Sequence, residues 1–424
     1  MIKFSKTLVV VMTLSLSLFV FSGCGRNGAQ TTPSQTDKKV TLNYFHYSAT
    51  DVAGLDPAAK EFTVENPNIE VRNEMISTDY NTVLKAKDAA GKLPDIFEAS
   101  TAGESALKPY IDAKKISDVS NLKIIKRLPD SVKKSITFSD GKIYMIPLTN
   151  AVRGMIYNKE LFKKAGISAV PKTLDELKAD VDKLKSTNII PFGVAGKDGW
   201  TLGSCIFQQG QEIYSSKEWL NNKAKGQGSF KDNALPVFDL IDVIKNNAQP
   251  KFMEADYMTS VGLMAENKVA MVAQGNWFPG EVGKINADTE KNLGCFAIPY
   301  SNDASKNKLY FDNSSYMVVS SKADLNAVDK YFDFLVNGKG KELYFVATKN
   351  INPYGITFES NQVYSDIFAY IKSSNIILNY QYNNEPDGFW QINATAMQNY
   401  FSGTATKAQM LEQLDKGWDN IAKK

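Results

Sequence analysis

Apolar and polar residues alternate from Val40 to Phe45, and this pattern with a period of two predicts a β-strand. Polar residues follow from His46 to Asp51, and the next segment predicts a helix that extends to Glu65. Asn66-Pro67-Asn68 predicts a turn, after which Ile69 begins a second strand. Strand, helix and strand at this spacing indicate βαβ units, so we expect an α/β fold with a mainly parallel sheet.

The same kind of pattern continues along the chain. A helix is predicted from Tyr80 to Gly91, and a strand is predicted from Leu93 to Glu98. Two later helices are marked by a polar residue at the start with a Glu or Gln three positions on, namely Thr173 with Glu176 and Thr406 with Gln409. Apolar residues at helical spacing should face a core, and these stripes are Leu174, Leu177, Val181 and Leu184, then Leu325, Val328, Phe332 and Leu335, then Leu411, Leu414, Trp418 and Ile421.

The first residues have the features of a processing signal. Lys3 and Lys6 precede an uncharged apolar run from Leu8 to Phe21, which is shorter than the roughly 20 residues of a transmembrane helix. The run ends in Phe21-Ser22-Gly23-Cys24, which resembles the bacterial lipobox, although Phe21 replaces the usual Leu. We expect residues 1–23 to be a signal peptide and Cys24 to be lipidated. An uncleaved anchor or an ordinary secretory signal are the alternatives.

Residues 24–39 are rich in Gly, Gln, Thr, Ser and Pro, so we expect a flexible spacer between the lipidated N-terminus and the folded protein. About 400 residues remain after Cys24, which is too many for one compact core and indicates two lobes. Without Lys3 and Lys6 the 49 basic residues fall to 47, against 46 acidic residues. This balance gives no basis for nucleic-acid binding.

Histidine and cysteine are scarce, and this scarcity limits the chemistry. His46 is the single histidine of the chain, so Ser-His, Cys-His and multi-His metal sites would all have to include it. We expect His46 to be a solvated loop residue, with lining of a cleft as the alternative. Cys205 and Cys295 are expected to be small buried residues rather than a disulfide pair. We expect no metal and no cofactor, and with 23 Phe, 19 Tyr and 5 Trp the chain fits a binding protein better than an enzyme.

Four segments of the chain carry a family resemblance. The first is 91–96 (GKLPDI), and the second and most specific is 140–147 (DGKIYMIP) running on to 156–167 (IYNKELFKKAGI) and 171–177 (PKTLDEL). The third is Gly275-Asn276-Trp277 after the strand-like Lys268–Val272, and the fourth is Gly388-Phe389-Trp390. Together they resemble the extracellular solute-binding proteins of carbohydrate ABC transporters, the family 1 class that includes maltose-type binding proteins.

The resemblance implies a two-lobed periplasmic-binding-protein-like fold of type II, with several hinge crossings and a ligand cleft between the lobes. It implies a first lobe of 40–149 and 308–349, and a second lobe of 150–307 and 350–424. The implied function is capture of a mono- or oligosaccharide, hinge closure, and delivery to the membrane permease subunits of an ABC importer. We expect a monomer on the outer face of the cell membrane, held there by its lipid anchor.

A sugar has apolar faces that stack on aromatic rings and hydroxyls that bond to planar polar groups. Trp277 is the first candidate platform, Asn276 is a candidate hydroxyl partner, and Gly275 permits a close approach to the backbone. Trp390 and Trp200 are further candidates, whereas Trp219 and Trp418 are expected to be packing residues. For Trp277 and Trp390 the alternative is packing in a core.

The polar candidates come at the ends of predicted strands, where α/β folds place ligands. They are Tyr47, Ser48 and Asp51 after the first strand, Glu98 and Thr101 after the strand near 96, and Asn150 and Arg153 at the first crossing. The alternatives are helix capping for Ser48 and Asp51, and surface ion pairs for Arg153 and Glu98.

Three other functions remain open on the sequence alone. The chain could bind a peptide, an amino acid or a phosphorylated polyol, but an anionic ligand would need several basic residues and only Arg153 is well placed. It could be a sugar sensor for a membrane kinase. It could also be a carbohydrate enzyme in which Asp51 and Glu98 act as a pair, which is the least favoured alternative.

Overall fold

The computed structural model describes residues 39–99, 104–210, 217–348, 350–354, 362–373, 375–378, 385–386 and 388–422. Lys39–Lys424 form one compact unit. The expected signal peptide, Cys24 and nearly all of the spacer lie outside the described residues, as does Thr101. Within the described ranges, no helix has the length and apolar character that a membrane crossing requires.

The first part of the chain builds the predicted βαβ units. The elements are β1 (Val40–His46), α1 (Val52–Glu65), β2 (Ile69–Met75), α2 (Tyr80–Ala89) and β3 (Ile96–Ala99). β1 lies between β2 and β3 and is parallel to both, with Phe45 opposite Phe97. The ends of β1 and β3 therefore lie side by side, and the loops that follow them meet at one edge of the sheet.

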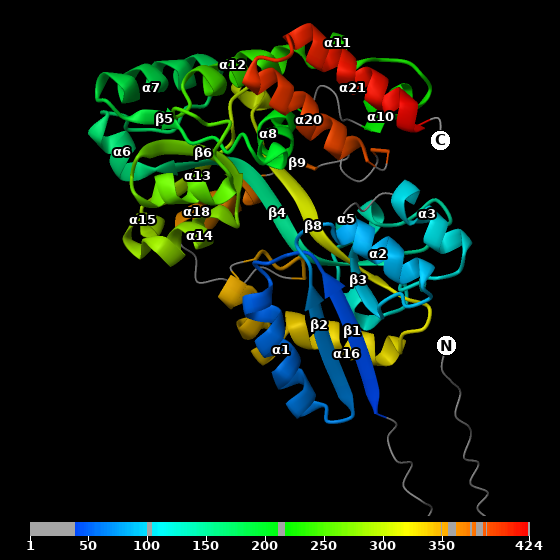
Figure 1. Ribbon diagram of the computed structural model, residues 1–424. Helices are drawn as coiled ribbons and strands as arrows, with labels where there is room; N and C mark the ends of the chain where they lie inside the picture. The colour runs from blue at the N-terminus through cyan, green and yellow to red at the C-terminus, as the bar shows by residue number, and fades with distance from the viewer. Residues whose placement is uncertain are drawn as a thin grey trace, which may run out of the picture. The chain divides into compact units, whose positions relative to one another are not determined.

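Two long antiparallel strands, β4 (Met145–Asn158) and β8 (Leu309–Val319), run through the centre of the sheet. Their lower halves pair beside β3, and their upper halves pair beside β6 (Val269–Gly275), β7 (Leu293–Phe296) and β9 (Ile376–Leu378), as can be followed in Figure 1. The pairing of β4 with β8 shifts register around Thr149. Among the described strands, the path across the sheet is β2-β1-β3-β8-β4-β6-β5, where β5 is Ile190–Phe192.

The prediction of a mainly parallel sheet is wrong for this centre. β3–β8, β4–β6, β4–β7 and β4–β8 are antiparallel pairs, whereas β1–β2, β1–β3, β5–β6 and β8–β9 are parallel pairs. The physical reason is that β4 and β8 cross the molecule in opposite directions and pair with each other, and that β4 also opposes both β6 and β7. The sequence of a fully buried crossing strand carries no sign of the direction of its partner.

Buried apolar residues form one cluster around the lower halves of β4 and β8 and two clusters around their upper halves. The first cluster draws on residues 42–148 and 316–345. The other two clusters draw on residues 152–309, 351–367 and 389–418. We refer to the residues around the first cluster as the first lobe and to those around the other two as the second lobe. β8 passes from one to the other between Leu309 and Tyr316.

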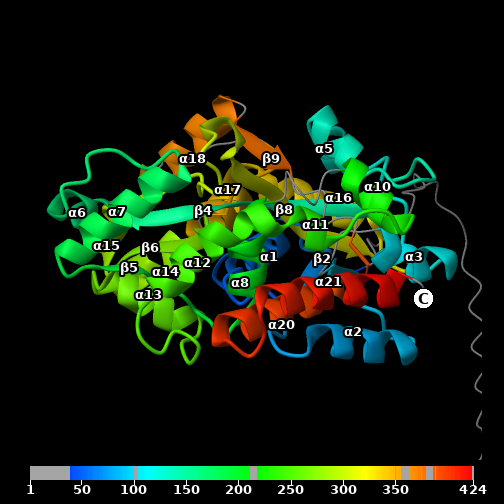
Figure 2. The same ribbon diagram turned by 90° about the horizontal axis from the view of Figure 1, so that it is seen from above.

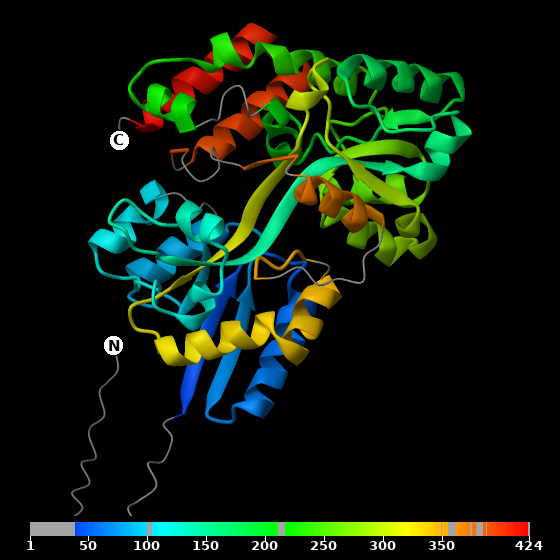
Figure 3. The ribbon, with the colours of Figure 1, turned by 180° about the vertical axis from the view of Figure 1, so that it is seen from behind.

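The first lobe is held together by aromatic contacts between its helices and β1. Tyr331 of α16 (Leu325–Val336) packs against Phe62 of α1 at 5.2 Å between ring centroids and against Tyr44 at 6.5 Å. Figure 3 shows α1 and α16 beside β1 and β2. The remaining elements of this lobe are α3 (Glu104–Asp112), α4 (Lys123–Lys126), α5 (Asp130–Ser135), α17 (Gly338–Lys341) and η4 (Glu342–Val346).

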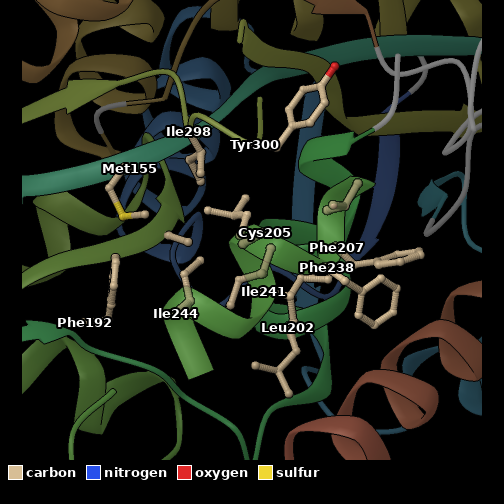
Figure 4. Packing of buried hydrophobic residues seen from close by; sticks show 14 of the residues in the cluster. Met155, Phe192, Leu202, Cys205, Phe207, Phe238, Ile241, Ile244, Ile298 and Tyr300 are labelled. Carbon is tan, nitrogen blue, oxygen red and sulfur yellow. The ribbon is translucent and has the colours of Figure 1, made fainter. Parts of the chain in front are cut away.

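The second lobe is larger and mainly helical outside its strands. Figure 4 shows part of its core, where Leu202 and Cys205 of α8 (Gly199–Cys205) lie near Ile241 and Ile244 of α12 (Phe238–Asn246). The remaining elements are α6 (Lys159–Lys164), α7 (Leu174–Ser186), η1 (Phe207–Gly210), α10 (Lys217–Ala224), α11 (Phe230–Asn233), η2 (Leu235–Val237), α13 (Tyr257–Ala265), α14 (Phe278–Ile285), α15 (Ala287–Lys291), η3 (Ala304–Lys306), α18 (Gln362–Lys372), α20 (Phe389–Ser402) and α21 (Lys407–Ala422).

Both predicted helix starts are confirmed. Thr173 accepts a hydrogen bond from the Glu176 amide, and Glu176 bonds back to the Thr173 amide, which is a complete capping box. Gln409 likewise accepts from the Thr406 amide at 2.8 Å. Such caps stabilise a helix because they satisfy amides that have no partner within it.

The expected packing residues are also confirmed. Trp418 is buried against Trp219, Phe230 and Phe389, where α21 runs beside α20 (Figure 2). Cys205 and Cys295 are buried and are not joined in a disulfide.

Candidate functional site

The carboxylate of Glu98 anchors the loop that follows β1. Glu98 is fully buried in β3, where its Oε2 accepts a hydrogen bond from the Tyr47 amide at 3.0 Å and its Oε1 accepts one from Ser315 Oγ at 2.7 Å. Tyr80 of α2 donates to the backbone oxygen of Glu98 at 2.7 Å, and its ring packs against that of Tyr47. The parallel pairing of β1 with β3 places these groups together.

Asp51 lies beside Glu98 and raises its proton affinity. Asp51 is 4% exposed and its Oδ1 accepts a hydrogen bond from Asn350 Nδ2 at 2.7 Å. Burial raises the pKa of Asp51, and hydrogen bonds from Asn350, Ser48 and Tyr344 oppose this rise. Burial and then repulsion by Asp51 raise the pKa of Glu98 to about 8. Burial and the nearby Asp51 thus favour the protonated form of Glu98, whose two oxygens contact Tyr47 and Ser315.

These residues form the polar side of the site. We call Tyr47, Ser48, Asp51, Glu98 and Asn350 the polar wall. Ser48 also shares a hydrogen bond with Thr50, with 3.0 Å between the hydroxyl oxygens. The interpretation of Glu98 as a surface residue in an ion pair is wrong, because its side chain is buried.

The second lobe contributes aromatic rings. Trp277 is the second residue after β6 and is partly buried, with its ring centroid 6.3 Å from that of Trp200. Trp200 in turn lies 5.4 Å from Tyr257, the first residue of α13. We call Trp200, Tyr257 and Trp277 the aromatic wall. Rings at such distances make the kind of broad apolar surface on which a flat apolar face can stack.

Gly275 and Arg153 hold the ring of Trp277 from one side. A Cβ built on Gly275 would overlap the six-membered ring of Trp277, so the ring is folded back onto the end of its own strand. The close approach that we expected at Gly275 is therefore made by Trp277 itself. Arg153 is the cross-strand partner of Gly275, and its guanidinium carbon lies 5.5 Å from the Trp277 ring and 5.3 Å from the Tyr310 ring. This arrangement suits cation–π attraction.

Two asparagines lie at the crossing between the lobes. Asn276 is buried, and its Oδ1 accepts a hydrogen bond from the Val152 amide at 2.9 Å, so this atom fixes the end of β6 to β4. Asn150 is buried in β4 and its amide donates to the Ile351 carbonyl at 2.8 Å. Asn150 Oδ1 has no hydrogen-bond partner among the described residues. Arg153 is also buried and is not a surface residue.

Trp277 of the aromatic wall and Asn350 of the polar wall line a cavity of about 250 Å³. Thr50 and Thr348 also line it, as do Glu281 and Glu290. The cavity thus combines an aromatic ring with two hydroxyls, an amide and two carboxylates.

The remaining candidates lie elsewhere. Trp390 is partly buried in the first turn of α20. This helix packs closely on α8, the helix that contains Trp200. The close contact is at Gly199, where an added Cβ would lie 2.9 Å from Ala394 Cβ. The prediction of His46 as a solvated loop residue is wrong, because it is the last residue of β1 and is 1% exposed. The strand extends one residue beyond the apolar alternation and buries the ring beside Tyr44.

Several residues that contribute to the site were not predicted from the sequence. Asn350 bonds to Asp51 across 299 residues, and no local pattern signals such a pairing. Tyr257 and Tyr310 had no motif around them, although Asp256 is a recognisable helix cap directly before Tyr257. Among the described residues, no group of three or more His, Cys, Asp and Glu side chains is arranged to hold a metal ion.

Comparison with known proteins gives a consistent result. The model of the bacterial extracellular solute-binding protein family matches residues 48–342. The multiple sugar-binding protein of Streptococcus mutans is 24% identical over 411 residues, covering 94% of each chain. The melibiose/raffinose/stachyose-binding protein MelE of Bacillus subtilis is 23% identical over 426 residues, covering 97% of this chain and 96% of MelE.

Solved structures show the same fold. The binding protein RafE in complex with raffinose has a TM-score of 0.76 at 20% identity, covering 90% of this chain and 100% of RafE. A sugar transporter protein from Bacillus licheniformis in complex with stachyose has a TM-score of 0.74 at 21% identity, covering 90% and 100%. The expected fold class, a two-lobed α/β binding-protein fold, is confirmed.

Proposed function

The chain belongs to the bacterial extracellular solute-binding protein family, and we propose that it captures an oligosaccharide between its two walls and delivers it to an ABC importer. One observation carries the proposal: Trp277 of the aromatic wall and Asn350 of the polar wall line the same cavity. A sugar ring can stack an apolar face on Trp277 while its hydroxyls bond to Asp51, Ser48 and Asn350.

The relatives support a sugar of more than one ring. MelE is named for melibiose, raffinose and stachyose, and a further relative from Streptomyces coelicolor is named for diacetylchitobiose. Two similar structures hold raffinose and stachyose. The same polar and aromatic residue types would serve each of these sugars, so the size of the ligand is better supported than its identity.

The rival functions fit less well. The family is one of solute-binding proteins, which counts against a carbohydrate enzyme with Asp51 and Glu98 as a catalytic pair. An anionic solute would need converging basic groups, but among the described residues that line the cavity the basic one, Lys284, pairs with Glu281. A sensor that passes its signal to a membrane kinase would use the same binding site, and it differs only in the partner protein.

Closure of the two lobes is the proposed conformational step. The proposed lobes are 40–149 with 308–349, and 150–307 with 350–424. β4, β8 and the segment near Ile351 join them, and the Asn150–Ile351 bridge ties two of these crossings together. Rotation about such short connections would bring the walls onto a ligand and form the closed shape that permease subunits recognise.

We propose that a lipid on Cys24 holds the protein at the outer face of the cell membrane. The spacer 24–39 would then let the folded unit extend away from the membrane surface. The family is extracellular by description. Labelling of cells with a radioactive fatty acid should mark the wild-type chain and leave Cys24→Ser unlabelled. Equal labelling of both chains would contradict the anchor.

The binding function is tested by a thermal-shift screen of the purified protein. The panel is galactose, melibiose, raffinose, stachyose, maltotriose and diacetylchitobiose, with amino acids, a tripeptide and a polyol phosphate as rivals. A sugar at 100 times its Kd should stabilise the protein by about 2.7 kcal/mol and raise its Tm by several degrees. Stabilisation by a rival solute alone would refute the proposal.

A further inference from the structure

His46 is a buried titratable residue that belongs to neither wall. It is the single histidine of the chain, it ends β1, and it is 1% exposed. Among the described residues, neither of its ring nitrogens makes a hydrogen bond of normal length and angle. Buried polar groups normally have such partners, and a buried charge needs them more than a neutral group does. The position therefore suits the neutral ring and is unfavourable for the protonated one.

The groups that face the His46 ring come from several elements of the first lobe. Asp56 of α1 is the ionisable group whose charge acts on the ring. β2 places the uncharged Met75 opposite His46, and the ring of Tyr44 lies 5.4 Å from that of His46. The tyrosines on this side stay uncharged near neutral pH because burial raises the pKa of each, and they are Tyr44, Tyr331 of α16 and Tyr344 of η4.

These surroundings lower the pKa of His46. Burial is the largest cause, and the negative charge of Asp56 and the backbone of Ser48 act in the opposite direction. Ser48 is part of the polar wall, and Asp56 is in α1, the helix that begins directly after Asp51 of the same wall. The groups that would attract a protonated His46 ring are therefore a wall residue and the helix next to the wall.

The backbone of His46 also leads directly into the polar wall. The His46 carbonyl accepts a hydrogen bond from the Ile76 amide at 3.0 Å, which fixes the end of β1 to the chain after β2. The next residue, Tyr47, donates its amide to Glu98 at 3.0 Å. A movement of His46 would therefore displace the backbone that holds Tyr47 on Glu98.

We propose that His46 is an acid-responsive switch of the sugar site, in which protonation turns the ring into a double donor that draws Ser48 and Asp56 toward it and disturbs the polar wall. The proposal rests on the proposed function and adds its regulation. Affinity for sugar should be constant above about pH 7 and should fall as the pH drops below 6.5, the ordinary pKa of histidine. Because linkage is reciprocal, bound sugar should favour the neutral ring.

Calorimetry with raffinose at about pH 7.5 and about pH 5 tests the switch. Wild-type affinity should fall by roughly fivefold or more between the two, and the affinity of His46→Phe, which keeps a ring but cannot ionise, should fall by less than about twofold. The fall that remains in His46→Phe belongs to Asp51, whose pKa is raised by burial. An equal fall in both proteins would overturn the switch and leave the proposed function standing. If neither protein bound raffinose at the higher pH, the proposed function would fail and the switch with it.

Nuclear magnetic resonance of the wild-type protein with isotope-labelled histidine gives a test without any variant, because the chain has a single histidine. The measured pKa of His46 should lie below 6.5 and should fall further when raffinose is bound. The same pKa with and without raffinose would overturn the coupling. Asp56→Asn removes the charge that favours protonation, so it should move the fall in raffinose affinity to lower pH.

Discussion

The two walls of the site achieve rigidity in different ways. In the polar wall, Glu98 and Asp51 are buried and are held by hydrogen bonds from Tyr47, Ser315 and Asn350. In the aromatic wall, Trp277 is held by contact with Gly275 and by the guanidinium of Arg153. The first arrangement depends on protonation and the second does not, because the pKa of Glu98 is about 8 whereas rings and arginine do not titrate near neutral pH. The comparison predicts that the effects of substitutions in the two walls will differ in their dependence on pH as well as in their magnitude.

The largest effect is expected from Trp277→Ala. Removal of the ring takes away the platform for the first sugar, and affinity for raffinose should fall by roughly 100-fold or more, as for a dominant residue at an interface. Calorimetry at neutral pH measures the change. The ring also packs against both clusters of the second lobe, so a moderate fall in Tm should accompany it.

Trp219→Phe is the matched control for the loss of a tryptophan. Trp219 is buried against Phe230 and Trp418, away from the cavity lining. This variant should lower Tm and leave raffinose affinity unchanged. If Trp277→Ala lowered only Tm and kept its affinity, Trp277 would be a packing residue and the aromatic wall would have no binding role.

Gly275→Ala should have the next largest effect. The added Cβ would overlap the Trp277 ring and force it from its position, so raffinose affinity should fall by roughly 10- to 30-fold although the ring is still present. Gly262→Ala in α13 is the control, because a Cβ there meets nothing within 4 Å. It should raise stability by up to about 1 kcal/mol and leave binding intact. Normal affinity of Gly275→Ala would show that the ring position is not fixed by Gly275.

Much of this arrangement could be read from local sequence, and the part that could not has a clear physical origin. The strand from Val40, the capping box at Thr173 and the buried position of Trp418 follow from short-range patterns, and all are confirmed. The antiparallel pairing of β4 with β8 and the bond from Asn350 to Asp51 depend on contacts between distant residues. The roles of Gly275 and Arg153 depend on the rotamer of Trp277, which no sequence pattern specifies.

Glu98→Gln tests the pH dependence of the polar wall. The pKa of Glu98 in the folded protein is raised to about 8, above its ordinary value of 4.5, so the folded state keeps a proton that the unfolded state loses. Wild-type stability should therefore fall as pH rises from about 4.5 to about 8 and change little from this source outside that range. Glutamine resembles the protonated acid and cannot ionise.

Chemical denaturation at about pH 5 and about pH 9 measures this difference. Glu98→Gln should match wild type at the lower pH and exceed its stability by at least about 1.4 kcal/mol at the higher pH, the equivalent of one pKa unit. A constant difference between the two proteins across the range would contradict the buried, protonated state of Glu98.

Arg153→Lys should have the smallest effect. Lysine keeps the charge but loses the flat guanidinium between the Trp277 and Tyr310 rings, and the resulting weakening of the contact should be below about 1 kcal/mol. Raffinose affinity should fall by roughly threefold, and this ratio should be the same at about pH 7 as at about pH 9, on either side of the Glu98 pKa of about 8. A ratio that changed with pH would place Arg153 in the electrostatics of the polar wall.

The most direct test of the account is a crystal structure of the protein grown with raffinose. The account predicts one sugar ring stacked on Trp277, with hydroxyls at hydrogen-bond distance, about 2.7–3.2 Å, from Asp51 and Asn350 on the opposite wall. Raffinose bound at a position that contacts neither Trp277 nor Asp51 would contradict the claim that the two walls together form the sugar site.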